Sequence, residues 1–257
     1  MLCAEMPPKG ADSDTHKYIF FTDIPRGNPM EVIMKNRYFT SKKIAHLAIL
    51  LALVIVLQIV GTLIGKLGVT APSLVLIPIV LGAVLLGPAA GALLGFLFGV
   101  IVVVMGATGM DYFTFVLLGE QPVLTVLLCL IKGTAAGLVS GFLFRAIRKK
   151  NDRAGVIVAS LVAPIVNTGL FILGALFMSD TLSANFVPDG QTVLYFLVIG
   201  CAGLNFIFEF LINAVASPAI YTVMKVRSSS RRASVSADEE AASSDTHRAP
   251  VAAKENK

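Results

Sequence analysis

Long runs of apolar residues, separated by short polar segments, occupy most of the chain between residues 44 and 224. About 20 apolar residues are enough for a helix to cross the hydrocarbon core of a bilayer. The predicted spans are roughly Ile44–Ile64, Ser73–Leu86, Ala89–Gly109, Pro122–Ile147, Val156–Met178 and Thr192–Met224. We therefore expect an all-α integral membrane protein, built as a compact bundle of six transmembrane helices.

The second predicted span is short, and only the sequence LLGPAAG (85–91) separates it from the third. Gly87 and Pro88 favour a turn there, because proline suits the first position of the helix that follows. A single bent helix is the alternative, but residues 73–109 are too many for one crossing.

The composition agrees with a membrane location. Hydrophobic residues make up 56% of the chain and charged residues 14%, with a mean hydropathy of +0.80. An ordinary soluble domain is only about 45–50% apolar. The three cysteines form no CxxC motif and no cluster with histidine, so the sequence predicts neither a metal site nor a disulfide framework, and no cofactor.

The net charge of +5 could suggest nucleic-acid binding, but the positions of the charges favour a membrane topology instead. Lysine and arginine gather before the first span, between the fourth and fifth, and after the sixth. These cations are Lys35, Arg37, Lys42 and Lys43, then Arg145, Arg148, Lys149, Lys150 and Arg153, then Lys225, Arg227, Arg231 and Arg232. The positive-inside rule then predicts that both termini are cytoplasmic, and an even number of spans agrees with this.

The predicted membrane domain covers residues 34–225. Residues 226–257 are rich in serine, alanine and charge, and we expect them to form a disordered cytoplasmic tail. Residues 1–33 have no apolar run of the signal-peptide type. Codons for MEVIM (30–34) can contain a bacterial ribosome-binding sequence, so we expect translation to begin at Met34 and residues 1–33 to be untranslated upstream sequence or disordered.

Glycine recurs at four-residue spacing in the third and fourth spans. The two series are Gly91, Gly95 and Gly99, and Gly133, Gly137 and Gly141. Such spacing leaves one helix face without side chains, so that two helices can approach closely. Glycine is common in membrane helices, but two series in register favour close packing.

Alanine forms a stripe on the first span. Ala45, Ala48 and Ala52 fall on one face of a helix. The stripe could be an internal packing face or a docking face for another membrane protein, and composition leaves both readings open.

Few strongly polar side chains are expected deep in the membrane. Lys132 is ten residues into the fourth span, which places it ~15 Å down a helix, and Asn167 is about as deep in the fifth. Asn205, Glu209 and Asn213 share one face of the sixth span. A charge at mid-span costs about 2.5–3.5 kcal/mol on insertion scales, so these groups need partners.

Two arrangements would satisfy these polar groups. Lys132 and Glu209 could form an ion pair, or the charges and amides of three successive spans could line a polar pocket. The sequence has no P-loop, dinucleotide-binding turn, HExxH or GxSxG motif. We therefore expect a protein that is not an enzyme and that does not itself hydrolyse ATP.

Several segments together resemble the substrate-binding S component of energy-coupling-factor (ECF) vitamin transporters, over about residues 40–225. The resemblance rests on the Ala48-x-x-x-Ala52 pair and on the segments LIPIVLGAVLLGPAAGALLGFLFG (76–99), VASLVAPIVNTGLFILGALF (158–177) and LNFIFEFLINAVASP (204–218). It implies a high-affinity vitamin-binding subunit of an ABC-type importer in the bacterial cytoplasmic membrane.

The resemblance also implies partners and a site. Ala45, Ala48 and Ala52 would dock on a coupling transmembrane protein driven by two ATPase subunits. The later helices and the outer loops (109–122 and 179–191) would form the vitamin pocket and its lid. That matches the positions of Lys132, Asn167, Asn205 and Glu209, which we therefore expect to bind the substrate.

The substrate follows less directly from the residues. Lys132 could pair with a ligand carboxylate, which favours pantothenate. Riboflavin is the second choice, because phenylalanine rings could stack on it; these are Phe171, Phe206, Phe208 and Phe210. Folate, biotin and thiamine are further options. The alternative function is a stand-alone secondary transporter in which Glu209 carries a proton, although no internal inverted repeat supports it.

Overall fold

The computed structural model describes residues 41–65 and 74–247. Apart from Ser41, they belong to the compact unit that begins at Lys42. The expectations for residues 1–33 and for a start at Met34 lie outside the described residues, as do Ser73, the predicted first residue of the second span, and the end of the tail (248–257).

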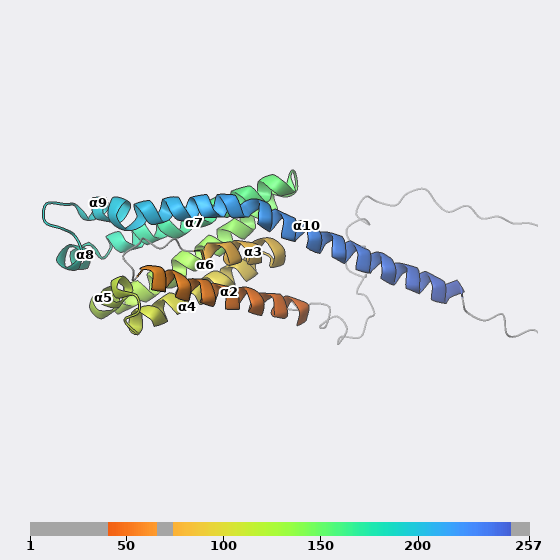
Figure 1. Cartoon of the computed structure of the whole chain (residues 1–257), viewed down its shortest axis with the longest axis horizontal. Helices are drawn as coiled ribbons and strands as arrows, with labels where there is room; N and C mark the ends of the chain where they lie inside the picture. Colours follow the sequence, from red (N-terminus) through yellow and green to blue (C-terminus); the bar gives the residue numbers. More distant parts are fainter. Residues whose placement is uncertain (1–40, 66–73, 248–257) are drawn as a thin grey trace, which may run out of the picture. The chain divides into compact units, whose positions relative to one another are not determined.

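The described residues are almost entirely helical and contain no strand. In chain order the elements are α2 (Ser41–Gly65), α3 (Leu76–Leu86), α4 (Pro88–Ala107), α5 (Tyr112–Glu120), α6 (Pro122–Ile147), α7 (Asp152–Leu176), α8 (Ser179–Asn185), α9 (Val193–Tyr195), the π-helix η3 (Phe196–Gly203) and α10 (Leu204–His247). The long helices pack as a bundle in which α4 contacts α6, α6 contacts α7, and α7 contacts α10 (Figure 1).

Five of these helical stretches are long and apolar enough to cross a membrane: Lys43–Ile64, Pro88–Ala107, Pro122–Ile147, Asp152–Leu176 and Val193–Ser230. The second predicted span is α3, which has only 11 residues. At 1.5 Å per residue it is about 17 Å long, too short to cross the hydrocarbon core alone. The all-helical membrane fold is thus confirmed, whereas the sixth crossing and the cytoplasmic termini stay predictions.

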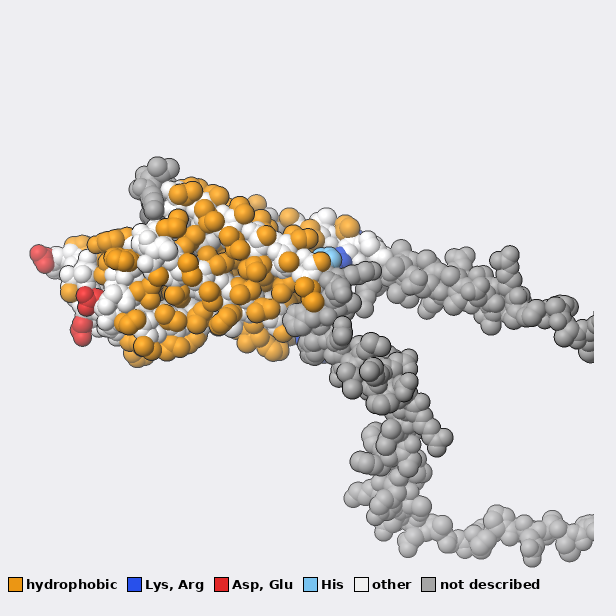
Figure 2. Space-filling model, turned by 90° about the horizontal axis from the view of Figure 1, so that it is seen from below, with side chains coloured by type: hydrophobic (Ala, Val, Ile, Leu, Met, Phe, Trp, Pro, Cys, Tyr) orange, Lys and Arg blue, Asp and Glu red, His pale blue; other side chains and the backbone are white. Residues whose placement is uncertain are grey.

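The surface has the character that lipid contact requires. Figure 2 shows hydrophobic side chains over most of the described face in that view, with acidic side chains gathered at one end. Among the large apolar side chains that are exposed are Ile49, Val104, Leu173 and Val215. Apolar exposure on this scale marks an interaction surface in a soluble protein and is the normal state of a membrane protein's exterior.

The turn predicted between the second and third spans is confirmed. Gly87 ends α3 with φ of 108°, a conformation that glycine adopts without steric cost. Pro88 then takes the first position of α4, where a missing N–H leaves no hydrogen bond unmade. The two helices are separate elements, so the single bent helix does not occur.

The two glycine series bring the backbones of α4 and α6 into close contact, as predicted. A methyl group built on Gly95 would collide with the carbonyl of Gly133, and one on Gly137 with the carbonyl of Gly91. One built on Gly99 would lie 2.5 Å from the Cys129 carbonyl oxygen. The order of these pairs makes α4 and α6 antiparallel, and it fixes the height of Lys132, the neighbour of Gly133, in the bundle.

The last long helical stretch departs from the prediction in two ways. It begins with one turn of α9 and the eight-residue π-helix η3 before α10 starts. α10 then continues to His247, so residues 226–247 are helical where we expected a disordered tail. Neither proline nor glycine occurs between residues 219 and 247, so no helix-breaking residue ends α10 where the apolar sequence ends.

The alanine stripe of α2 faces outward. Ala45, Ala48 and Ala52 are all exposed, whereas Leu50 and Val54 on another side of the helix are buried in the core. The internal packing face, one of the two readings of the stripe, is therefore excluded within the described residues.

Candidate functional site

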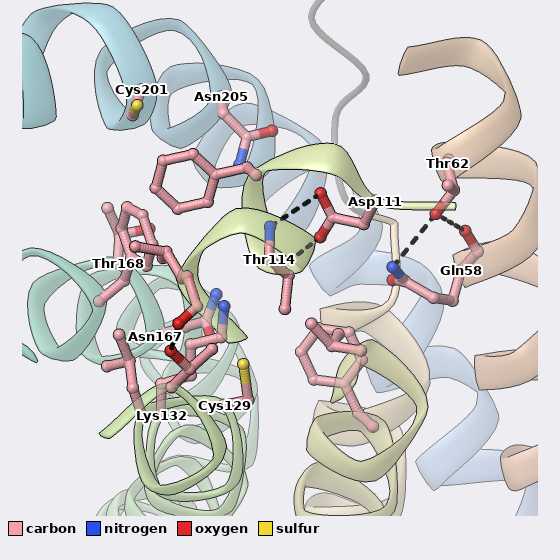
Figure 3. Close-up of a pocket in the computed structure, with 18 of the residues that line it drawn as sticks. Gln58, Thr62, Asp111, Thr114, Cys129, Lys132, Asn167, Thr168, Cys201 and Asn205 are labelled. Atoms are coloured by element: carbon pink, nitrogen blue, oxygen red, sulfur yellow. Dashed lines mark hydrogen bonds between the residues drawn. The ribbon is translucent and has the colours of Figure 1, made fainter. Parts of the chain in front are cut away.

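A cavity of about 650 Å³ lies among α2, α4, α5, α6, α7, η3 and α10 (Figure 3). This volume falls within the roughly 300–1,000 Å³ that is typical of small-molecule sites. Its lining mixes apolar side chains such as Phe98, Val102 and Leu117 with a small set of polar ones. An apolar cavity with a few polar groups is the usual form of a site that orients one small ligand.

All four residues predicted to bind the substrate line this cavity. Lys132 comes from α6, Asn167 from α7, and Asn205 and Glu209 from α10. The packing of α6 on α7 and of α7 on α10 brings them together. Asn213, the third polar residue of the same α10 face, lies outside the cavity and donates from Nδ2 to the Glu209 carbonyl oxygen over 2.8 Å.

Glu209 is the most deeply buried of the four, with its side chain 1% exposed. Its Oε1 accepts a hydrogen bond from Asn205 Nδ2 at 2.9 Å. The two residues are four apart on α10, which places their side chains next to one another. Glu209 Oε2 is buried and has no hydrogen-bond partner within the protein.

Asn167 shows the same pattern on α7. Its side chain is 8% exposed, and its Oδ1 is buried without a partner in the protein. A buried polar group that lacks a hydrogen bond costs about 1–3 kcal/mol. Two such oxygen atoms in the lining of one cavity are the kind of groups that a bound ligand satisfies.

Lys132 does not pair with Glu209. Its Nζ lies 5.1 Å from the centroid of the Phe171 ring, a cation–π contact. The ion pair found among the described residues joins Arg148 to Asp152, 3.8 Å apart on the surface. The mutual ion pair that the sequence allowed is therefore absent in the described bundle, and the ammonium group of Lys132 is free of a carboxylate partner there.

Sequence reasoning missed several polar residues of the lining. Gln58 and Thr62 enter from α2, joined by a hydrogen bond of 3.4 Å between Gln58 Nε2 and Thr62 Oγ1 (Figure 3). Asp111 caps α5 by accepting from the Thr114 backbone N–H at 3.5 Å. Gln58 could have been found as an isolated amide in an apolar run, and Asp111 as a helix-capping residue before Thr114.

The two predicted lid segments differ in their positions. Residues 109–114 and Leu117 line the cavity, whereas the segment 179–191 contributes none of the described lining residues. That segment instead supports α5 from outside, because the Phe186 ring contacts the Phe113 ring with centroids 4.9 Å apart. The first segment therefore lies against the cavity, and the second packs on the first.

The aromatic lining also differs from the expectation. Phe171 lines the cavity, but Phe206, Phe208 and Phe210 do not. Phe208 is exposed on the bundle surface, and Phe206 and Phe210 contact each other with ring centroids 5.8 Å apart. The aromatic rings of the lining are instead Phe98, Tyr112, Phe113 and Phe171, so the stacking surface that riboflavin would need comes from α4, α5 and α7 rather than from α10.

Comparison with known proteins gives one match. The family model described as "ECF transporter, substrate-specific component" matches residues 42–221. This range contains every residue that lines the cavity. No match was found among curated proteins or among solved structures.

Proposed function

Because the chain belongs to the family of substrate-specific components of ECF transporters, we propose that it binds a water-soluble vitamin in the cavity of Figure 3. Family membership makes it a membrane subunit that confers substrate specificity on a transporter, rather than an enzyme. Beyond family membership, we propose the binding site, the class of substrate and the location, which is the bacterial cytoplasmic membrane.

One observation carries the proposal. Four polar residues that the sequence predicts deep in the membrane converge from three helices on one cavity within the matched range: Lys132, Asn167, Asn205 and Glu209. Buried polar groups in a membrane protein are costly, so their collection at one place favours a functional site over chance.

Pantothenate is the vitamin that this lining favours. The ammonium group of Lys132 has no carboxylate partner among the described residues, and a ligand carboxylate would form a charge-assisted hydrogen bond with it. Riboflavin is the second choice, since aromatic rings of the lining could stack on it; these are Phe98, Tyr112, Phe113 and Phe171.

The exposed alanine stripe supports the proposed partner. Ala45, Ala48 and Ala52 present small side chains on the outside of α2, and small residues allow another membrane helix to approach closely. We assign the stripe to the coupling transmembrane protein of the ECF module, whose two ATPase subunits would supply the energy.

Thermal unfolding of the detergent-purified protein with five vitamins tests the substrate assignment. Pantothenate at 100 times its Kd should stabilise the protein by about 2.7 kcal/mol, and riboflavin, folate, biotin and thiamine should shift its unfolding temperature less at the same concentration. A larger shift with another vitamin would replace pantothenate and leave the binding function in place. No shift with any of the five would contradict the vitamin pocket.

A further inference from the structure

The part of the cavity lined by α7 and α10 offers hydrogen-bond acceptors that the protein leaves unused. Glu209 Oε2 and Asn167 Oδ1 are both buried and both without a partner within the protein. Their side chains are 1% and 8% exposed, and both residues belong to the lining. We call these two oxygen atoms the acceptor pair.

The neighbouring amides of α10 leave Glu209 Oε2 without a hydrogen-bond donor. Asn205 Nδ2 donates to Glu209 Oε1 at 2.9 Å, and Asn213 Nδ2 donates to the Glu209 carbonyl oxygen at 2.8 Å. Asn205, one turn before Glu209, and Asn213, one turn after it, thus both donate to atoms other than Oε2. Asn205 is therefore a positioning residue for Glu209, in addition to lining the cavity itself.

The positive charge of the site comes from a different helix. Lys132 on α6 holds its ammonium group over the Phe171 ring. An ammonium group is a hydrogen-bond donor only. The two unpartnered oxygen atoms of the lining therefore come from α7 and α10, and its cationic donor comes from α6.

Building on the proposed function, we infer that the substrate directs at least two hydrogen-bond donors, hydroxyl or N–H groups, at the acceptor pair. Its anionic group lies at Lys132. A ligand carboxylate turned toward α7 and α10 would place acceptor against acceptor, which is repulsive. The site thus selects an anionic molecule with a hydroxylated or N–H-bearing end, and binds it in one direction.

Two variants test this direction, with the vitamin that stabilises the wild-type protein as the probe. Asn167→Leu removes the Oδ1 acceptor and should bind the probe about tenfold or more weakly than the wild-type protein does. Glu209→Gln should lower the affinity for the probe about tenfold to a hundredfold. Asn205 would still donate to the new amide oxygen, so the amide nitrogen would replace Oε2 and set a donor against the ligand donor.

Asn185→Asp on α8 is the matched control. Its amide nitrogen donates to the Thr181 carbonyl oxygen at 2.9 Å outside the cavity, so this variant should keep wild-type affinity. Wild-type affinity in either Asn167→Leu or Glu209→Gln would overturn the inference.

A second measurement, which needs only the wild-type protein, tests the same ligand orientation if a variant does not fold. The wild-type protein is titrated with the probe and with its analogue in which the hydroxyl and N–H donors are methylated; for pantothenate this is the di-O-methyl, N-methyl derivative. We expect the analogue to bind at least a hundredfold more weakly than the probe, because each of the two lost hydrogen bonds should lower the affinity about tenfold or more. Equal affinity would refute the inference and leave the vitamin site standing, whereas a wild-type protein that binds none of the five vitamins would refute the proposed function itself.

Discussion

Replacement of Ala48 or Ala52 by tryptophan should abolish vitamin uptake in cells that carry the coupling module, while the isolated protein should still bind its vitamin. Both alanines are exposed on α2, so an indole there leaves the bundle and the cavity undisturbed. A docking face of methyl groups leaves no space for an indole, and close helix approach through small residues is then lost. Uptake of labelled vitamin in cells and titration in detergent measure the two effects separately.

Leu53→Trp is the matched control for this experiment. Leu53 lies on the same helix and is also exposed, with 41% of its surface accessible, but it is turned about 100° around the helix from Ala52. We expect uptake to continue in this variant, because fluid lipid can rearrange around an indole, whereas a close-packed protein interface cannot. Equal loss of uptake in all three variants would show that any bulky residue on α2 is harmful, and loss of binding in detergent would show that the stripe supports the fold.

The double change Lys132→Met plus Glu209→Gln should leave the fold intact and remove ligand binding. Each replacement keeps the approximate shape and removes one charge. A hydrogen bond to a charged group contributes roughly 1.5–3 kcal/mol, so each single change should weaken binding about tenfold to a hundredfold. The loss should be larger at Lys132 for a carboxylate such as pantothenate, and similar at the two positions for a neutral vitamin.

The folded state of the double variant requires its own control. Removing two charges that formed only a buried ion pair is often harmless, but Lys132 and Glu209 make no such pair in the described bundle. Arg148→Met plus Asp152→Asn removes the surface ion pair instead, whose side chains are both 52% exposed, and should change neither binding nor the unfolding temperature appreciably. Wild-type affinity in the Lys132 and Glu209 double variant would remove both residues from the site.

The polar residues of the cavity could be predicted because few residue types are tolerated deep in a membrane. Lys132, Asn167 and Glu209 interrupt apolar runs, and each must find a partner or a ligand wherever the helices pack. The close contact of α4 with α6 could be predicted equally well from their glycine series, because helices whose backbones touch leave no room for a larger side chain. These features depend on local chemistry and need no knowledge of the tertiary arrangement.

Other features depend on which face of a helix meets its neighbours, and the sequence does not encode that directly. Gln58 and Thr62 line the cavity because α2 turns them inward, whereas its alanines face outward. Phenylalanine suits lipid and pocket equally well, so the sequence did not separate Phe171 in the lining from Phe208 on the surface. The π-helix before α10 leaves no recognisable mark in an apolar run.

The central claim, that this family member carries a vitamin in the cavity, is tested most directly by identifying what the protein holds. The protein is purified in detergent from cells grown with the five vitamins and then denatured, and the released small molecules are analysed by mass spectrometry. The Lys132→Met, Glu209→Gln double variant, purified in parallel, gives the background. We predict one water-soluble vitamin, pantothenate, near one molecule per chain in the wild type and absent from the variant. A wild-type sample with no vitamin above that background would contradict the account.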